Sequence, residues 1–206
     1  MSVPSPDFPA SGYARVLGEA TTTLDRSGIP HVVFGSIALK ALGRPRPGVP
    51  DEDIDLMIRP PDANPALRAL EDEGFVVEDA DPSWLNKATR SGVTVDLIFR
   101  TAGEMHLDDQ MLSRAVPHQV DGTTVRLIPP EDLAVMKAVL YEEHRPFEWF
   151  DALALVSRPD LDWDYLVRRA VRHGAQRVLS LVLYARSSGV AVPSEVVDGL
   201  VTAVDR

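Results

Sequence analysis

Residues 32–58, VVFGSIALKALGRPRPGVPDEDIDLMI, contain the most informative pattern in the chain. An apolar run ends in Gly35 and Ser36, and a short helix-like segment and a proline-rich loop follow. Asp53 and Asp55 then alternate with apolar residues. Side chains two apart in a strand share a face and lie roughly 6.5–7 Å apart along it. The pattern therefore predicts a strand with one apolar face and both carboxylates on the other.

Two facing carboxylates repel, and each raises the pKa of the other, so a divalent cation between them removes a penalty. Oxygen ligands without a thiolate or an adjacent histidine favour Mg²⁺ or Mn²⁺ over zinc. A third acid, Asp96, stands between apolar residues in the expected strand 93–99, where an unpaired charge is costly. If this strand neighbours the Asp53 strand, three carboxylates converge and can hold two ions roughly 3.5–4 Å apart. We therefore expect Asp53, Asp55 and Asp96 to be catalytic and metal-binding.

Gly35 and Ser36 stand between a strand and the start of a helix. Glycine lets the backbone approach a ligand closely, and the helix N-terminus favours an anion. Lys40, Arg44 and Arg46 place positive charge on this helix or just after it. The segment predicts a phosphate site in which Gly35, Ser36, Lys40 and Arg46 bind the nucleotide.

The composition limits the class of protein. The chain has 206 residues, of which 45% are apolar, enough for one generous domain or for one domain with an appendage. It has no cysteine, which excludes disulfides and thiolate metal sites and fits a cytoplasmic location. The net charge of -10 makes extended nucleic-acid binding unexpected. No apolar run reaches the roughly 18–20 residues of a membrane span, and residues 1–10 look like a loose leader rather than a signal peptide.

Periodicity and turn residues predict an α+β fold followed by helices. Strands are expected at residues 31–34, 53–59, 75–78, 85–90 and 93–99, with a hairpin at 118–128 around Asp121 and Gly122. Helices are expected at residues 13–26, 36–42 and 61–74, then in 103–116, and in the all-helical region at 129–143, 147–157, 163–173, 175–187 and 194–204. We therefore expect a core in residues 1–128 and an all-helical region in residues 129–206.

These motifs together resemble the DNA polymerase β-like nucleotidyltransferase superfamily, in which a strand-Gly-Ser-helix unit precedes an Asp-x-Asp strand and a later acid. The segments PPEDLAVMKAVL and RPFEWFDALAL are similar to the part that follows the core in small bacterial members, including abortive-infection-type toxins. In those enzymes a lysine helix is followed by an acid and, three residues later, an aspartate. The matching positions here are Lys137, Glu148 and Asp151.

The resemblance implies a mixed β-sheet core flanked by helices, with the helical C-terminal region walling the cleft. It implies transfer of an NMP from an NTP to a hydroxyl acceptor, which is a small molecule, an RNA end or a protein. Asp53 and Asp55 would hold both metal ions, and Asp96 would complete one of them and assist deprotonation of the acceptor. Lys137 would reach the triphosphate and Asp151 would position that lysine or the acceptor. An antitoxin partner is implied for a toxin role.

Simpler interpretations exist for several of these residues. Asp53 and Asp55 could belong to a solvated acidic turn that runs into an edge strand, and Asp151 could only cap or pair within the helices. Lys137 shares a face with apolar residues, from which lysine side chains often reach solvent. The tryptophans are expected to be core or surface anchors, namely Trp84, Trp149 and Trp163. A member that binds a nucleotide or a partner without turnover is the alternative function.

Overall fold

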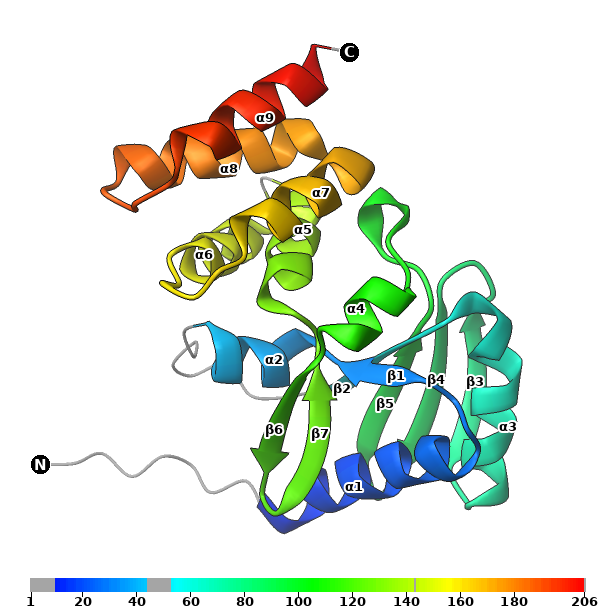
Figure 1. Ribbon diagram of the computed structural model, residues 1–206. Coiled ribbons are helices and arrows are strands. Elements are labelled where there is room, and N and C mark those ends of the chain that lie inside the picture. The colour runs from blue at the N-terminus through cyan, green and yellow to red at the C-terminus, as the bar shows by residue number, and fades with distance from the viewer. Residues whose placement is uncertain (1–9, 44–52, 143, 206) are drawn as a thin grey trace, which may run out of the picture.

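The computed structural model describes residues 10–43, 53–142 and 144–205 (Figure 1). In these residues seven strands form one mixed sheet in the order β3-β4-β5-β2-β1-β7-β6. The strands are β1 (His31–Val33), β2 (Asp53–Ile58), β3 (Val76–Asp81), β4 (Leu85–Arg90), β5 (Val93–Ile98), β6 (Val116–Val120) and β7 (Thr123–Leu127). The expected α+β class with a mixed sheet is confirmed.

Helices flank the sheet and then form the rest of the described chain (Figure 1). The core contains α1 (Ala10–Arg26), α2 (Gly35–Leu42), α3 (Ala63–Asp72) and α4 (Asp109–Ser113), with 3-10 turns η1 (Pro60–Asp62) and η2 (Ala102–Glu104). The C-terminal helices are α5 (Pro130–Leu140), α6 (Pro146–Val156), α7 (Trp163–His173), α8 (Ala175–Ser187) and α9 (Ser194–Val204). Helices α1 and α3 pack against the sheet and each other, and α5 to α9 stack above it in Figure 1.

Strand β2 lies in the middle of the sheet, between β5 and β1. It runs parallel to β5, with Asp55 directly opposite Asp96, and antiparallel to β1. Ile54 and Leu56 are fully buried, as the alternation predicts. Because β2 has a strand neighbour on both sides, the interpretation of Asp53 and Asp55 as an acidic edge strand is wrong.

The other predicted helices and strands differ from those in the structure mainly in where they begin and end. The hairpin is confirmed, with positive φ at both Asp121 (44°) and Gly122 (87°), the backbone that a tight two-residue turn requires. The helical parts of residues 103–116 are only the end of η2 and the short helix α4, which the side chain of Asp108 caps and which ends at Ser113. The predicted loop at 44–50 and nearly all of the leader lie outside the described residues. A domain division at residue 128 stays a prediction.

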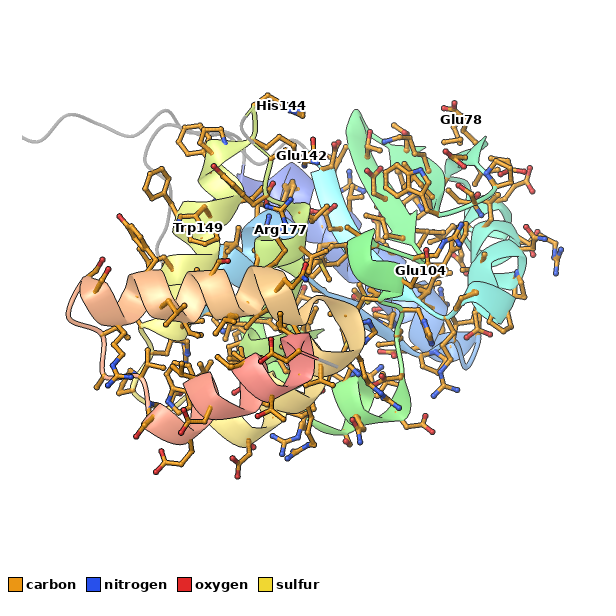
Figure 2. The ribbon with its side chains drawn as sticks, turned by 90° about the horizontal axis from the view of Figure 1, so that it is seen from above. Glu78, Glu104, Glu142, His144, Trp149 and Arg177 are labelled. Carbon is orange, nitrogen blue, oxygen red and sulfur yellow. The ribbon has the colours of Figure 1, made fainter. Side chains whose placement is uncertain are left out.

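Aromatic contacts connect the C-terminal helices. Trp149 of α6 packs against Tyr141, with ring centroids 5.3 Å apart, and against Tyr184 of α8, with centroids 6.0 Å apart. Arg177 of α8 lies over the Tyr141 ring, and Figure 2 shows Trp149 and Arg177 on neighbouring helices seen from above. Trp149 therefore acts as the expected packing anchor.

A buried ionic network joins the helices to the core. Asp132 of α5 accepts hydrogen bonds from Arg169 and from the Tyr165 hydroxyl of α7, the latter at 2.7 Å. Arg169 also pairs with Asp108, the residue that caps α4. Asp132 and Arg169 are both fully buried. None of the helices in the described ranges combines the length and the apolar character needed to cross a membrane.

Candidate active site

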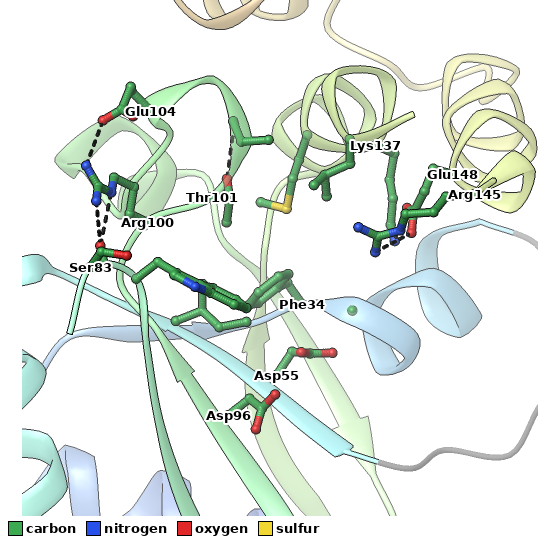
Figure 3. A pocket seen from close by; sticks show the side chains of 16 residues that line it. Phe34, Asp55, Ser83, Asp96, Arg100, Thr101, Glu104, Lys137, Arg145 and Glu148 are labelled. Carbon is green, nitrogen blue, oxygen red and sulfur yellow. Dashed lines mark hydrogen bonds and ion pairs between the residues drawn. The ribbon is translucent and has the colours of Figure 1, made fainter. Parts of the chain in front are cut away.

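The candidate site is a cleft of about 640 Å³ between the sheet and helices α5 and α6 (Figure 3). Asp55 and Asp96 lie side by side on its floor, as the strand register requires. Lys137 and Glu148 line the opposite wall. The sheet therefore supplies adjacent carboxylates, and the C-terminal helices supply the groups that face them.

The floor carboxylates have raised pKa values. Burial and then the charge of Asp96 raise the pKa of Asp55 to about 6, and the positive charge of Lys137 acts in the opposite direction. Burial also raises the pKa of Asp96, against the hydrogen bonds from Lys87. The charge of Asp53 contributes to both shifts. Asp53 and Asp96 thus both act on Asp55, and Asp53 also acts on Asp96, across the same face of the sheet.

Gly35 lies tightly against this floor. Its φ is +57°, and a Cβ on it would lie 1.8 Å from Oδ2 of Asp55. Both facts exclude a larger side chain without movement of the carboxylate. The sequence pattern Gly-Ser before the helix therefore has a steric explanation: only glycine lets α2 begin beside Asp55.

Ser36 is the second residue of α2, and its hydroxyl is buried without a hydrogen-bond partner in the described residues. A buried unsatisfied hydroxyl costs free energy unless a ligand completes it. The first turn of a helix also presents free N–H groups and a partial positive charge. The start of α2 is thus suited to accept a phosphate group.

The three residues taken from the resemblance meet in space. Nζ of Lys137 lies 2.6 Å from Oε2 of Glu148 and 3.8 Å from Oδ2 of Asp151. Arg145 reaches the other oxygen of Glu148 at 3.3 Å. The Lys137 side chain is only 12% exposed, so it is held in the cleft wall rather than extended into solvent. Asp151 contacts the lysine but does not line the cleft.

The two other predicted cations differ in what the structure describes. Lys40 is exposed in the last turn of α2. Arg46 lies outside the described residues, as does Arg44. In the described chain, the groups at the cleft that are suited to a phosphate are therefore the α2 N-terminus and Lys137.

The acids fit a divalent cation by chemistry but are not gathered around one point. Within the described ranges no three histidine or acidic side chains are close enough together to hold a metal ion. Hard carboxylate oxygens with a raised pKa, as at Asp55, favour a cation. Asp96, however, is already paired with a positively charged side chain. Nζ of Lys87 donates to its two oxygens at 2.8 and 3.1 Å.

Comparison with known proteins decides the family. The sequence model of a family described as "Uncharacterised nucleotidyltransferase" matches residues 10–187. The chain belongs to this family. The protein is thus a nucleotidyltransferase, an enzyme that takes an NTP as substrate. No curated protein matches the chain.

Solved structures of nucleotidyltransferases are similar to this one. An antigenic nucleotidyltransferase-like protein from Paracoccidioides brasiliensis is 14% identical, with a TM-score of 0.54 over 92% of each chain. The antibiotic-resistance factor ANT(2'')-Ia is 18% identical, with a TM-score of 0.49 over 87% of this chain and 94% of its own. The lincosamide antibiotic adenylyltransferase LnuA is 12% identical, with a TM-score of 0.47 over 68% of this chain and 94% of its own. The first of these supports the fold.

The nucleotidyltransferase cleft also contains residues that the sequence analysis did not select. Trp84 lines it with 41% of its surface exposed, and its Nε1 donates to Asp81 at 2.9 Å. Arg100 donates to the Ser83 carbonyl at 2.8 and 3.1 Å and closes one end (Figure 3). No sequence periodicity identifies such loop residues. Lys87, however, could have been identified from the sequence, because the Ser91-Gly92 turn fixes the hairpin register and so places Lys87 opposite Asp96.

Proposed function

We propose that this nucleotidyltransferase uses Mg²⁺ or Mn²⁺ to transfer an NMP from an NTP to a hydroxyl acceptor in the cleft above β2 and β5. One observation carries the proposal: a start of α2 suited to an anion lies directly against Asp55, which pairs in register with Asp96. Carboxylates that favour a cation thus lie in contact with a helix N-terminus that favours an anion. This combination suits a complex of a divalent ion with a triphosphate.

The roles follow from chemistry and position. The α2 N-terminus with the Ser36 hydroxyl binds the phosphates, and Lys137 faces them from α5. Asp53, Asp55 and Asp96 would hold the divalent ion, which would supply neutralisation of phosphate charge. Asp96 accepts the proton of the acceptor hydroxyl as its oxygen bonds to the α-phosphorus and the bond to pyrophosphate breaks. Positioning and charge stabilisation supply most of the acceleration.

In-line transfer places the acceptor opposite the leaving pyrophosphate. If pyrophosphate leaves toward Ser36, the acceptor occupies the other end of the cleft, beside Trp84, Arg100 and Glu104. Its class stays open among small molecules, RNA ends and proteins, and the net charge of -10 disfavours long RNA. The antibiotics named with similar structures, tobramycin and lincomycin, are suitable first small-molecule acceptors to assay. A toxin role with an antitoxin partner, in the cytoplasm, stays a prediction.

The test is to incubate the protein with each α-³²P-labelled NTP, a cell extract or the two antibiotics, and Mg²⁺, Mn²⁺ or EDTA. The proposal expects label in one fraction, with a divalent ion only, and loss of that label in Asp96→Asn. NTP binding that is independent of metal, without transfer to any fraction, would instead support a binding module without turnover.

A second measurement concerns Ser36→Ala. Its hydroxyl has no partner in the described chain, so removal should not lower the melting temperature. A hydrogen bond to a charged phosphate contributes about 1.5–3 kcal/mol, so KM for the NTP should rise about tenfold or more. Ser180→Ala is the matched control, because that hydroxyl donates within α8 to the Gln176 carbonyl. Equal KM values for Ser36→Ala and the unmodified protein would remove Ser36 from the phosphate site.

A further inference from the structure

Lys87 occupies a fixed place beside the floor of the cleft. The hairpin of β4 and β5 puts Lys87 directly opposite Asp96, and antiparallel partners place their side chains on the same face. Its Nζ donates to both oxygens of Asp96, at 2.8 and 3.1 Å, and one third of the side chain is exposed. Across the sheet the row reads Lys87, Asp96 and Asp55, and it ends against Gly35.

The charges around Lys87 are almost all negative. Burial acts to lower the pKa of Lys87, but the hydrogen bond and charge of Asp96, together with Asp53 and Glu78, raise it, so the ammonium stays charged. Lys137, the other lysine near the floor, is already paired with Glu148. Among the described residues, Lys87 is therefore the cation that directly neutralises a floor carboxylate.

This arrangement has two opposite consequences for a divalent ion. The ammonium compensates Asp96 and so lets it remain close to Asp55 before any ligand binds. The same ammonium occupies the oxygens that a metal ion would need, and repels that ion electrostatically. Lys87 thus stabilises the site while making it a poorer site for a free cation.

We propose that Lys87 is a built-in cation that competes with divalent metal for Asp96 and makes metal binding depend on bound NTP. The inference rests on the proposed function, because it assumes that metal and NTP meet at Asp55 and Asp96. Negative phosphates attract the ammonium away from Asp96 while a divalent ion takes its place on the carboxylate. Binding of nucleotide and of metal is then positively coupled, and by linkage each favours the other equally.

Measurement of bound Mn²⁺ tests this without turnover. Free Mn²⁺ is followed by electron paramagnetic resonance in titrations of the full chain, with and without a non-hydrolysable ATP analogue. In the nucleotide-free protein, Lys87→Met should bind Mn²⁺ about tenfold more tightly than the unmodified protein. The factor by which the analogue tightens Mn²⁺ binding should be correspondingly smaller in Lys87→Met.

Two further variants separate this role from ordinary charge and packing effects. Lys87→Arg keeps the cation and should retain the weak, nucleotide-dependent Mn²⁺ binding. Arg90→Met removes one positive charge from the same strand, but Arg90 donates to the Glu73 carbonyl at 2.7 Å, on the face that packs against α3. Its Mn²⁺ affinity should therefore equal that of the unmodified protein. Lys87→Gln replaces Lys87→Met if the latter does not fold, as judged by circular dichroism.

The outcomes are distinct. Unchanged or weaker Mn²⁺ binding in folded Lys87→Met or Lys87→Gln would overturn the proposal and leave Lys87 as a structural ion pair. Equal tightening in Arg90→Met would assign the effect to net charge and overturn it as well. Failure of the proposed function would look different: the unmodified protein would transfer no label, whereas the Mn²⁺ comparison would still judge Lys87.

Discussion

Asp55→Asn is expected to reduce nucleotidyl transfer at least a thousandfold and, at the same time, to stabilise the metal-free protein at neutral pH. The loss of activity follows from the role proposed for Asp55: an amide carries no charge to hold a divalent ion beside the phosphates. The gain in stability follows from burial and from repulsion by Asp96, which raise the pKa of Asp55 to about 6. A neutral amide of the same shape removes that repulsion.

The sign of the pH dependence can be worked out. In the folded, metal-free protein Asp55 binds its proton more tightly than in the unfolded chain, where the pKa is 3.8. Ionised Asp55 therefore destabilises the fold above about pH 6, and this cost disappears as the pH falls toward 4. A shift of about two units corresponds to at most about 3 kcal/mol. Asp55→Asn should exceed the unmodified protein in unfolding free energy at pH 7.5, and match it near pH 4.

Thermal or urea unfolding in EDTA, followed across this pH range, measures the difference. Asp162→Asn is a control of opposite sign, because the backbone N–H of Tyr165 donates to this N-cap and lowers the pKa of Asp162. Its stabilising contribution is present at neutral pH and is lost as the pH falls. Retained transfer activity in Asp55→Asn, or lower stability at pH 7.5, would contradict the placement of Asp55 at a charged floor.

The sequence predicted where the strands of the site lie in the chain, but not which strands are adjacent in the sheet. Alternation of acids and apolar residues was enough to place Asp53 and Asp55 on one face of β2, and the apolar run around Asp96 was enough for β5. That β2 and β5 are adjacent, with Asp55 opposite Asp96, depends on strand order, which no local pattern encodes. The sequence analysis stated this adjacency only as a condition.

Contacts between the C-terminal helices were even harder to predict from local sequence patterns. Helical periodicity located α5 and α6, but not the 2.6 Å contact between Lys137 and Glu148, which depends on how two helices pack. Resemblance to known enzymes suggested those positions instead. Periodicity alone also could not show where α4 begins within residues 103–116, because its start depends on the capping contact of Asp108, a residue that pairs with the distant Arg169.

Arg169→Met is expected to cost about 3–5 kcal/mol of unfolding free energy, the usual effect of breaking a buried ion pair by removing one partner. Arg169 is fully buried and holds Asp132 and Asp108 from α7. Without the guanidinium, Asp132 loses its compensating charge in a place where burial already raises its pKa to about 6. Urea unfolding at pH 7.5 measures the loss, and Arg168→Met, an exposed neighbour on α7, should change little.

The double variant Arg169→Met/Asp132→Leu separates charge from packing. Replacing both buried partners with apolar side chains leaves no uncompensated ion at their contact, so the double variant should recover much of the stability lost in Arg169→Met. Full recovery is not expected, because Asp108 loses Arg169 and the Tyr165 hydroxyl loses its acceptor. Since η2 lines the cleft and Asp108 follows it, a folded double variant with altered KM would show that the network also positions the cleft wall. Equal stability of the single and double variants would mean that Asp132 is not the destabilising charge.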